Sequence, residues 1–162
     1  MLCSSVQTKK EVFMPVGELC TRQTVVVPLG TSLGDATKLM REYHVGDLVV
    51  IERTDGKRRP VGIVTDRDIV IEVLAQGLDP ARLSVEDIMT RDPVTVHEQD
   101  GLFETMRIMR TNGIRRIPVV DGEGALAGIV AVDDLIELLA DELSLIAKVI
   151  VQERRQEAEV RA

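Results

Sequence analysis

The feature that most constrains this chain is a segment that occurs twice. Residues 62–69 read GIVTDRDI and residues 128–135 read GIVAVDDL. In each copy a glycine precedes two β-branched residues, and aspartates stand before an apolar helical run, so each copy predicts a short buried strand that leads directly into a helix. The copies differ at the turn, where Thr65 in the first corresponds to Ala131 in the second.

The rest of the chain repeats in the same order. Residues 16–50 align with residues 85–119 without a gap, and the next hairpin is longer in the first copy, at 53–60, than in the second, at 121–124. An ordered internal repeat indicates two similar structural units. Neither half of a 162-residue chain would bury enough surface alone, so we expect one compact domain or two small halves that share a core.

Each unit has the pattern of a short helical lead-in, a strand, a helix, a two-stranded hairpin and a closing helix. Ser84, with Asp87 three residues later, is the expected N-cap of the second lead-in. Ser32 and Asp100 are the expected N-caps of the helices that follow the first strands. The other expected elements are strands at 25–27, 48–51, 94–96 and 117–120 and turns at 55–56 and 121–122. Strands that alternate with amphipathic helices predict a single α/β layered body.

The last helix has no stop signal. From Val132 to the end of the sequence there is neither glycine nor proline, whereas the matching helix of the first unit stops near Gly77. Its apolar stripe consists of Leu135, Leu138, Leu139, Leu143, Ile146, Val149 and Ile150. Because nothing in its own chain remains to be covered, we expect this stripe to pack on a partner subunit, with residues 153–162 as a solvated end.

Charge and composition argue against nucleic acid as a partner. The formal net charge is -7 and the pI is near 4.9, whereas duplex DNA requires a basic face. Aromatic residues make up 2% of the chain, so stacking platforms for single strands are missing. Any base that binds here must therefore lie between aliphatic side chains.

The sequence also predicts a cytoplasmic protein. It has no signal-peptide core near its start and no run approaching the ~18 apolar residues of a membrane span, so we expect no membrane partner. Cys3 and Cys20 have no CxxC spacing, which suits a reducing compartment. His44 and His97 stand apart from each other and from both cysteines, so we expect no metal site.

These features resemble the CBS-domain pair, a regulatory module named after cystathionine β-synthase. The resemblance covers residues 14–141, and its most specific parts are GIVTDRD at 62–68, RIPVVD at 116–121 and DIMT at 87–90. It implies an α/β fold of tandem β-α-β-β-α repeats related by pseudo-two-fold symmetry, with a long C-terminal helix, as a free-standing CBS protein. The implied divisions are a tail at 1–13, repeats at 14–77 and 78–141, and a helical extension at 142–162.

The resemblance also implies two ligand sites, because members of this family bind adenosine-containing molecules such as AMP, ATP or S-adenosylmethionine between repeats. Their ribose-contacting aspartate falls on Asp68 in the first repeat and on Asp134 in the second, and each site borrows from the other repeat. The first implied site consists of Ile63, Thr65, Asp68, Thr90, Val94, Thr95, Ile114 and Arg115. The second consists of Thr21, Val25, Val26, Val45, Gly46, Arg116, Ile129 and Asp134.

Neither implied site is complete on its phosphate side. Thr65 supplies a hydroxyl there, and the amides at the helix start would form an anion seat, but the second site has Ala131 instead of threonine. Arg116 matches an arginine that contacts phosphate in some relatives, but its counterpart in the first repeat is Asp47, which would repel phosphate. The first site thus has the threonine and the second has the arginine.

Structural roles that need no ligand also remain possible for the same residues. Thr65 and Asp68 form the pattern of an N-cap with an acidic third residue, which would fix a helix end without any ligand. Arg115 and Arg116 would also suit a solvated strand edge, or ion pairs across a dimer. The basic run at 57–59 is expected to be a solvated hairpin tip.

Two functions are consistent with these features. The first is a homodimeric regulatory protein without an obligatory cofactor, which senses AMP, ADP, ATP or an S-adenosylmethionine-type ligand and modulates a partner protein. The second is a ligand-free structural module that dimerises and docks on a partner, as Ala131 and Asp47 suggest. An enzyme is the weakest alternative, because the sequence has no nucleophile with an adjacent base, no glycine-rich phosphate loop and no metal cluster.

Overall fold

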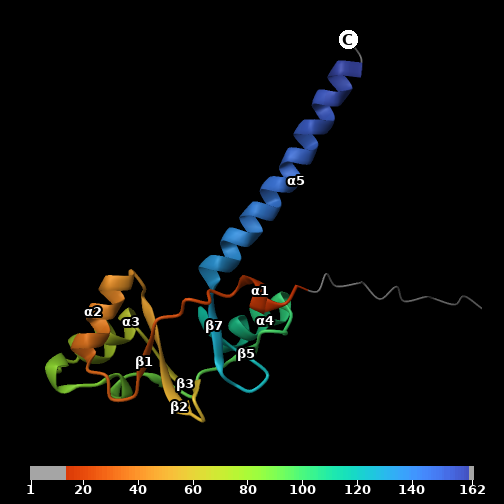
Figure 1. Cartoon of the computed structure of the whole chain (residues 1–162). Coiled ribbons are helices and arrows are strands. Elements are labelled where there is room, and N and C mark those ends of the chain that lie inside the picture. Colours follow the sequence, from red (N-terminus) through yellow and green to blue (C-terminus); the bar gives the residue numbers. More distant parts are fainter. Residues whose placement is uncertain (1–13, 161–162) are drawn as a thin grey trace, which may run out of the picture.

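Two sheets organise residues 14–160, which are the residues described by this computed structural model; the expected tail at 1–13 lies outside them (Figure 1). The first sheet has the order β1-β2-β3-β4, with β1 at Val26–Pro28, β2 at Asp47–Thr54, β3 at Lys57–Thr65 and β4 at Thr90–Arg91. The second has the order β5-β6-β7, with β5 at Val96–His97, β6 at Arg116–Val120 and β7 at Leu126–Ala131. In each sheet the first pair of strands is parallel and the next is antiparallel.

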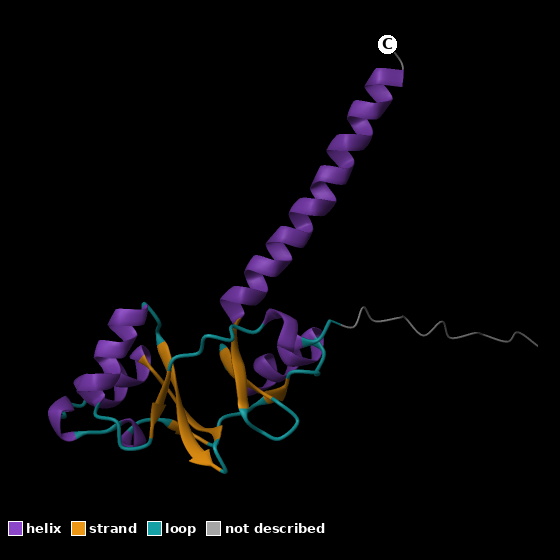
Figure 2. Cartoon of the chain, viewed as in Figure 1, coloured by secondary structure: helices purple, strands orange, loops and turns teal. Residues whose placement is uncertain are grey.

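The two halves have helices at corresponding places along the chain, and Figure 2 shows these helices in purple. The first half contains α1 (Val16–Leu19), α2 (Leu33–Tyr43), α3 (Asp66–Asp68) and the π-helical turn η1 (Ile69–Leu74). The second contains the 3-10 turns η2 (Pro80–Arg82) and η3 (Val85–Asp87), then α4 (Leu102–Asn112) and α5 (Val132–Val160). The predicted α/β class is confirmed.

Of the three N-caps predicted for the second lead-in and for the helices after the first strands, two were right. The Ser32 side chain accepts a hydrogen bond from the Asp35 amide, and Ser84 with Asp87 forms a capping box. Asp100 was wrong, because Gly101 is the N-cap of α4. The Asp100 carboxylate instead accepts a hydrogen bond from the amide of His97 at 2.8 Å, which closes the turn before the helix.

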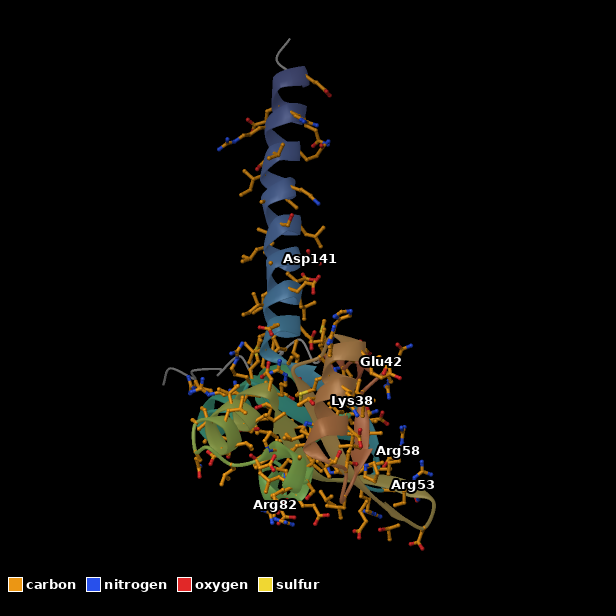
Figure 3. The ribbon with its side chains drawn as sticks, turned by 90° about the vertical axis from the view of Figure 1, so that its left-hand side faces the viewer. Lys38, Glu42, Arg53, Arg58, Arg82 and Asp141 are labelled. Atoms are coloured by element: carbon orange, nitrogen blue, oxygen red, sulfur yellow. The ribbon has the colours of Figure 1, made fainter. Side chains whose placement is uncertain are left out.

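The β2–β3 hairpin turns at Asp55 and Gly56, as the sequence predicted. Both residues have positive φ, at 53° and 76°, which Asp tolerates and Gly adopts without strain. Figure 3 shows the labelled Arg53 and Arg58 pointing away from the body. Lys57 differs from the expected solvated tip, because its ammonium forms an ion pair with Glu123 of the second half.

Each half completes the sheet of the other. Strand β4, which belongs to the lead-in of the second half, pairs with β3 of the first half, so that Ile63 lies opposite Thr90. In the same way Thr21 pairs with Ile129 of β7, through N–H···O distances of 2.9 and 3.1 Å. The two lead-ins, residues 14–22 and 83–91, are therefore exchanged between the halves.

Glycine is required where each exchanged lead-in crosses a strand. A Cβ atom on Gly62 would collide with the sulfur of Met89, and one on Gly128 would lie 2.7 Å from the sulfur of Cys20. These contacts place the lead-ins directly against the strands that end in the GIV segments.

The buried side chains form two matching cores. The first consists of Val27, Leu33, Ala36, Met40, Leu48, Val50, Val64, Ile69, Val73, Val85 and Met89. The second consists of Val16, Cys20, Val96, Leu102, Met109, Ile117, Val119, Val130 and Leu135. A third cluster, Val49, Ile51, Leu126 and Ile129, joins the two sheets, so the halves share apolar contact as the sequence predicted.

The closing helices differ between the halves. Helix α5 buries Leu135 near its start, then projects away from the body in both views (Figures 1 and 3). Its apolar side chains from Leu143 to Val151 are exposed. Among the described residues, no helix combines the length and apolar character needed to cross a bilayer.

Candidate ligand-binding site

A cavity of about 370 Å³ lies where the first half meets the β6 end of the second. This volume is within the range of small-molecule sites. Its walls are formed by Ile63, Thr65, Asp66, Asp68, Thr90, Asp92, Pro93, Val94, Gly113, Ile114, Arg115 and Arg116. Aliphatic side chains and Pro93 supply apolar walls, and charged side chains supply a polar edge.

Asp68 is held in place by the turn that starts α3. One of its carboxylate oxygens, Oδ2, accepts hydrogen bonds from the Thr65 amide at 2.8 Å and from the Thr65 hydroxyl at 2.7 Å. The Asp68 amide donates to the Thr65 hydroxyl oxygen at 3.2 Å. The expected N-cap explanation is therefore confirmed as a complete capping box, and Oδ1 is the carboxylate oxygen outside it.

Seven of the eight residues assigned to the first site line this cavity. The eighth, Thr95, is exposed and does not line it. The reason is alternation, because neighbouring residues in an extended segment point to opposite sides and Val94 already faces the cavity. Whether these residues bind a ligand stays a prediction.

Arg116 lines the Asp68 cavity, although the sequence assigned it to the second site. Its guanidinium forms an ion pair with Asp47, its pseudo-symmetric counterpart, so both partners lie at the junction of the two halves. Thr65 and Arg116, which the resemblance divided between two sites, therefore meet at one cavity. The exposed Arg115 pairs with Asp133 at 3.7 Å, also within the chain.

The junction around Asp47 is rich in carboxylates. Burial raises the pKa of the Asp47 carboxyl above its ordinary value, the Arg116 guanidinium lowers it, and the charges of Asp66 and Asp134 raise it further. The direction is upward because desolvation outweighs the attraction of the single arginine. Arg116 is thus already engaged by nearby negative charge.

Four cavity residues escaped the sequence reasoning, namely Asp66, Asp92, Pro93 and Gly113. Asp66 stands between Thr65 and Asp68 in the repeated segment, so its position was a usable signal. The Asp-Pro dipeptide at 92–93 marks a turn beside β4, and Gly113 ends α4 with φ of 63°. Their approach to Asp68 depends on the exchanged lead-in, which local patterns do not report.

The residues assigned to the second site have more varied positions. The carboxylate of Asp134 accepts a hydrogen bond from the Ala131 amide at 2.9 Å, which repeats the backbone contact of Asp68 without a threonine hydroxyl. Thr21 and Ile129 are joined by backbone hydrogen bonds. Val25 and Val45 pack against the first core, and Val26 packs in the cluster between the sheets. The Gly46 carbonyl accepts a hydrogen bond from the Asp66 amide at 3.0 Å.

A second cavity, of about 360 Å³, lies between α4 and the start of α5. Its walls include Met106, Met109, Ile136 and Leu139, and they are almost wholly apolar. Met106 is partly buried and Met109 is buried against the second core, whereas their counterpart Met40 is buried in the first core. Among the described residues, no group of three or more potential ligands is placed to hold a metal ion.

The two halves with exchanged lead-ins and a cavity at their junction define a tandem-repeat α/β protein. The CBS domain family matches residues 16–75 and 85–141, so the chain belongs to that family and the resemblance noted in the sequence is confirmed. The predicted limits of the repeats, at 77 and 141, stay a prediction.

Known relatives support the same assignment. The chain is 38% identical over 124 residues to an uncharacterized protein of Methanopyrus kandleri, in a match that covers 76% of this chain and 61% of that protein. A hexameric CBS-CP12 protein from bloom-forming cyanobacteria is 34% identical, with a TM-score of 0.69 over 77% of this chain and 67% of that one. The CBS domain pair of protein MJ0100, solved with 5'-methylthioadenosine and S-adenosyl-L-methionine, is 26% identical, with a TM-score of 0.68 over 78% of this chain and 99% of that one.

Proposed function

We propose that this protein binds an adenosine-containing ligand in the Asp68 cavity and uses that binding to regulate a partner protein. The observation that carries the proposal is Asp68 itself, because it lines the cavity and its carboxylate is fixed by the capping box through Oδ2, while Oδ1 takes no part in that box. A carboxylate oxygen of this kind accepts ribose hydroxyls. The ligands of the MJ0100 relative support an adenosine derivative.

The aliphatic walls fit a purine without aromatic stacking. Ile63 comes from β3, Val94 precedes β5 and Ile114 precedes β6, so both halves supply a side of the slot. Burial of a flat ring between such side chains gives hydrophobic stabilisation in proportion to the area removed from water. A ligand in this cavity would therefore contact both halves, and its binding would stabilise the arrangement of the halves that forms the slot.

Isothermal titration against adenosine, 5'-methylthioadenosine, S-adenosylmethionine, AMP and ATP tests the proposal. We expect one ligand per chain and loss of binding in Asp68→Ala. Asp134→Ala is the matched control, because it removes the pseudo-symmetric carboxylate while the Asp68 cavity stays intact. If no compound binds a folded protein, the ligand-free interaction module is the better explanation.

A regulatory role also requires two states with different ligand affinity. Hydrogen exchange of the protein with and without ligand measures this directly. We expect slower exchange at the first turn of α3 and at β6, because both contribute residues to the cavity. Unchanged exchange throughout the chain would leave binding without a regulatory consequence.

We further propose that α5 pairs with α5 of a second copy. Five side chains with alternating spacings of three and four residues form an exposed stripe, with exposed fractions between 42% and 67%. They are Ile136, Leu139, Leu143, Ile146 and Ile150. Most helical stability in proteins comes from packing of an apolar face, and this spacing is that of two-helix packing.

The charges on α5 favour an antiparallel second copy. Its first 11 residues carry five carboxylates and no base. Beyond them the charges balance, with three bases at 148, 154 and 155 and three glutamates at 153, 157 and 159. A parallel pair would set the two acidic segments side by side, while an antiparallel pair places Arg154 and Arg155 near the acidic turns of the other copy. In that register Leu139 faces Ile150 and Leu143 faces Ile146.

Light scattering tests the pairing, with a dimer expected for the unchanged chain and a monomer for Ile146→Glu. Val151→Glu is the matched control, because Val151 is equally apolar and exposed but lies outside the stripe. In a Cys3→Ser background, mixing Leu139→Cys with Ile150→Cys should give a cross-linked heterodimer. Cross-linking of Leu139→Cys to itself would indicate a parallel pair, and a dimer that survives Ile146→Glu would exclude α5 as the contact.

A further inference from the structure

The backbone amides at the start of α3 are all engaged. The Thr65 amide donates to Asp68 at 2.8 Å, the Asp66 amide to the Gly46 carbonyl at 3.0 Å, and the Arg67 amide to the Asp66 side chain at 2.7 Å. The Asp68 amide donates to the Thr65 hydroxyl. The anion seat expected from the sequence is therefore filled by the protein's own oxygens, which corrects that expectation.

The cationic side chains of the cavity are engaged too. Arg116 is held by Asp47, and a Cβ on Gly46 would lie 3.3 Å from an Asp66 oxygen and 3.6 Å from an Arg116 nitrogen, so Asp66 is also close to Arg116. Arg115 is paired with Asp133. A phosphate group would have to displace Asp47 from Arg116 before it gained that guanidinium as a partner, and Arg115 would offer it only a solvated charge.

The remaining charge on the cavity wall is negative. Asp66, Asp68 and Asp92 all line the cavity. Of the two arginines on its wall, Arg116 is paired with the largely buried Asp47, whereas the exposed Arg115 lies 3.7 Å from Asp133 in solvent, where an ion pair contributes little. Like charges brought together at a partly buried site raise the free energy of binding, and that penalty grows with the charge of the ligand.

We infer that the Asp68 cavity selects uncharged or cationic 5'-substituted adenosines, namely thioether or sulfonium nucleosides, over adenosine phosphates. The inference rests on the proposed adenosine site and specifies the group at the 5' position. Asp68 receives the ribose hydroxyls, the aliphatic slot receives the base, and the acidic rim receives a neutral or positive 5' substituent. Asp47 acts as the selecting residue, because it holds Arg116 away from any phosphate.

Competition between four ligands in one buffer tests this inference. 5'-Methylthioadenosine and S-adenosylmethionine should bind, whereas AMP and ATP should bind at least about tenfold more weakly, as expected for charge repulsion at such a site. Higher salt should strengthen AMP binding and leave 5'-methylthioadenosine binding unchanged, because screening acts only on the repulsion. This salt measurement needs no variant, so it does not depend on the folding of a mutant.

Asp47→Asn supplies the second test, because it frees Arg116 and removes one negative charge. AMP affinity should rise about tenfold or more while 5'-methylthioadenosine affinity changes little. Asp55→Asn is the matched control: it removes the same charge at the hairpin tip, where φ of 53° also suits asparagine. AMP or ATP binding as tight as 5'-methylthioadenosine would overturn the selection but keep the adenosine site, whereas absence of binding by all four compounds would overturn both.

Discussion

The two repeats place equivalent side chains in their cores but differ where the GIV strand turns into a helix. In the first repeat Thr65 closes a capping box, and the helix that follows buries Val73 completely. In the second, Ala131 offers only its amide, and Leu139, the counterpart of Val73, is 42% exposed on the outgoing α5. The comparison teaches that the packed interior is common to both repeats, whereas the helix after the turn is packed in the first repeat and largely exposed in the second.

The stop signals after each helix explain the different paths. In the first repeat, Gly77 adopts φ of 70° and the Leu78 amide donates to the Val73 carbonyl at 3.0 Å, so the chain leaves the helix and η2 can pack on α2. In the second repeat no glycine or proline follows Val132 up to Val160, and the helix continues. The cavity between α4 and α5 lies beside this outgoing helix.

The largest expected effect is on the unfolding free energy, and it comes from replacing the two glycines that the lead-ins cross. Gly128→Ala should cost about 3 kcal/mol of unfolding free energy, because its Cβ would meet the Thr21 carbonyl at 2.9 Å, and backbone cannot move aside cheaply. Gly62→Ala should cost about 1 kcal/mol, because the atoms it meets belong to the flexible Met89 side chain. Urea unfolding measures both.

Gly122→Ala is the control for this pair, since a Cβ there meets nothing within 4 Å. It should leave the unfolding free energy nearly unchanged. An equal loss of unfolding free energy in Gly62→Ala and Gly128→Ala would contradict this prediction, because it would mean that both contacts relax to the same extent.

The next largest effect is on ligand affinity, and it distinguishes the carboxylate of Asp68 from that of Asp134. Asp68→Ala should weaken binding of the adenosine ligand about 100-fold, as expected when a charged acceptor of two hydroxyls is lost. Asp134→Ala should change that affinity less than threefold by comparison, because Asp134 does not line the cavity. Calorimetric titration of both variants gives the ratio, and the reverse ranking would move the site to the second repeat.

Each single substitution at a turn should make the helix capping of the two repeats more alike, and the two substitutions should change the unfolding free energy in opposite directions. Thr65→Ala should lower the unfolding free energy by about 1 kcal/mol, since the Asp68 amide loses its hydroxyl acceptor. Ala131→Thr should raise it by up to about 1 kcal/mol, because the Asp134 carboxylate already stands in position to complete the box. Chemical denaturation of the two single variants and of the double variant measures both changes, which should add because the turns are separate.

The smallest effect concerns the lead-ins, which are capped differently. Pro15 gives α1 no side-chain cap, whereas hydrogen bonds from the Ser84 amide and hydroxyl lower the pKa of Asp87 below its ordinary value of 3.8. Folding therefore favours ionised Asp87, and this stabilisation is present above the ordinary value and disappears as pH falls through the folded one. The stability gap between the unchanged chain and Asp87→Asn should be complete above the ordinary value of 3.8 and should shrink as the pH falls through the lower folded pKa. A gap independent of pH would contradict the capping role.

Sequence periodicity was sufficient for most of the helices and the core, because alternation and helical spacing report which side of a segment is buried. It was wrong for the strand expected at 94–96, which is observed at Val96–His97, and it did not predict the two-residue β4. The capping pairs at Ser32, Ser84 and Thr65 were also readable, since they depend on residues three apart. The position of Arg116 was not readable. Its contact with Asp47 joins residues 69 positions apart, across the junction that the exchanged lead-ins create.

The engaged amides at α3 illustrate the same limit. The residue pattern correctly placed a helix start at Thr65, yet it did not reveal that the carbonyl of Gly46 occupies the Asp66 amide. A helix start offers an anion site only where its amides remain free, and that depends on which strand end lies beside it.

The exchanged lead-ins also impose an order on folding during synthesis. Residues 14–22 leave the ribosome first, but their partner strand β7 is among the last parts of the body to be made, so the first lead-in must wait for most of the chain. The second lead-in follows directly after the repeat that it completes and can pair at once. The first repeat should consequently become protease-resistant once about residue 91 has emerged, whereas the second should gain protection only when both ends of the body meet.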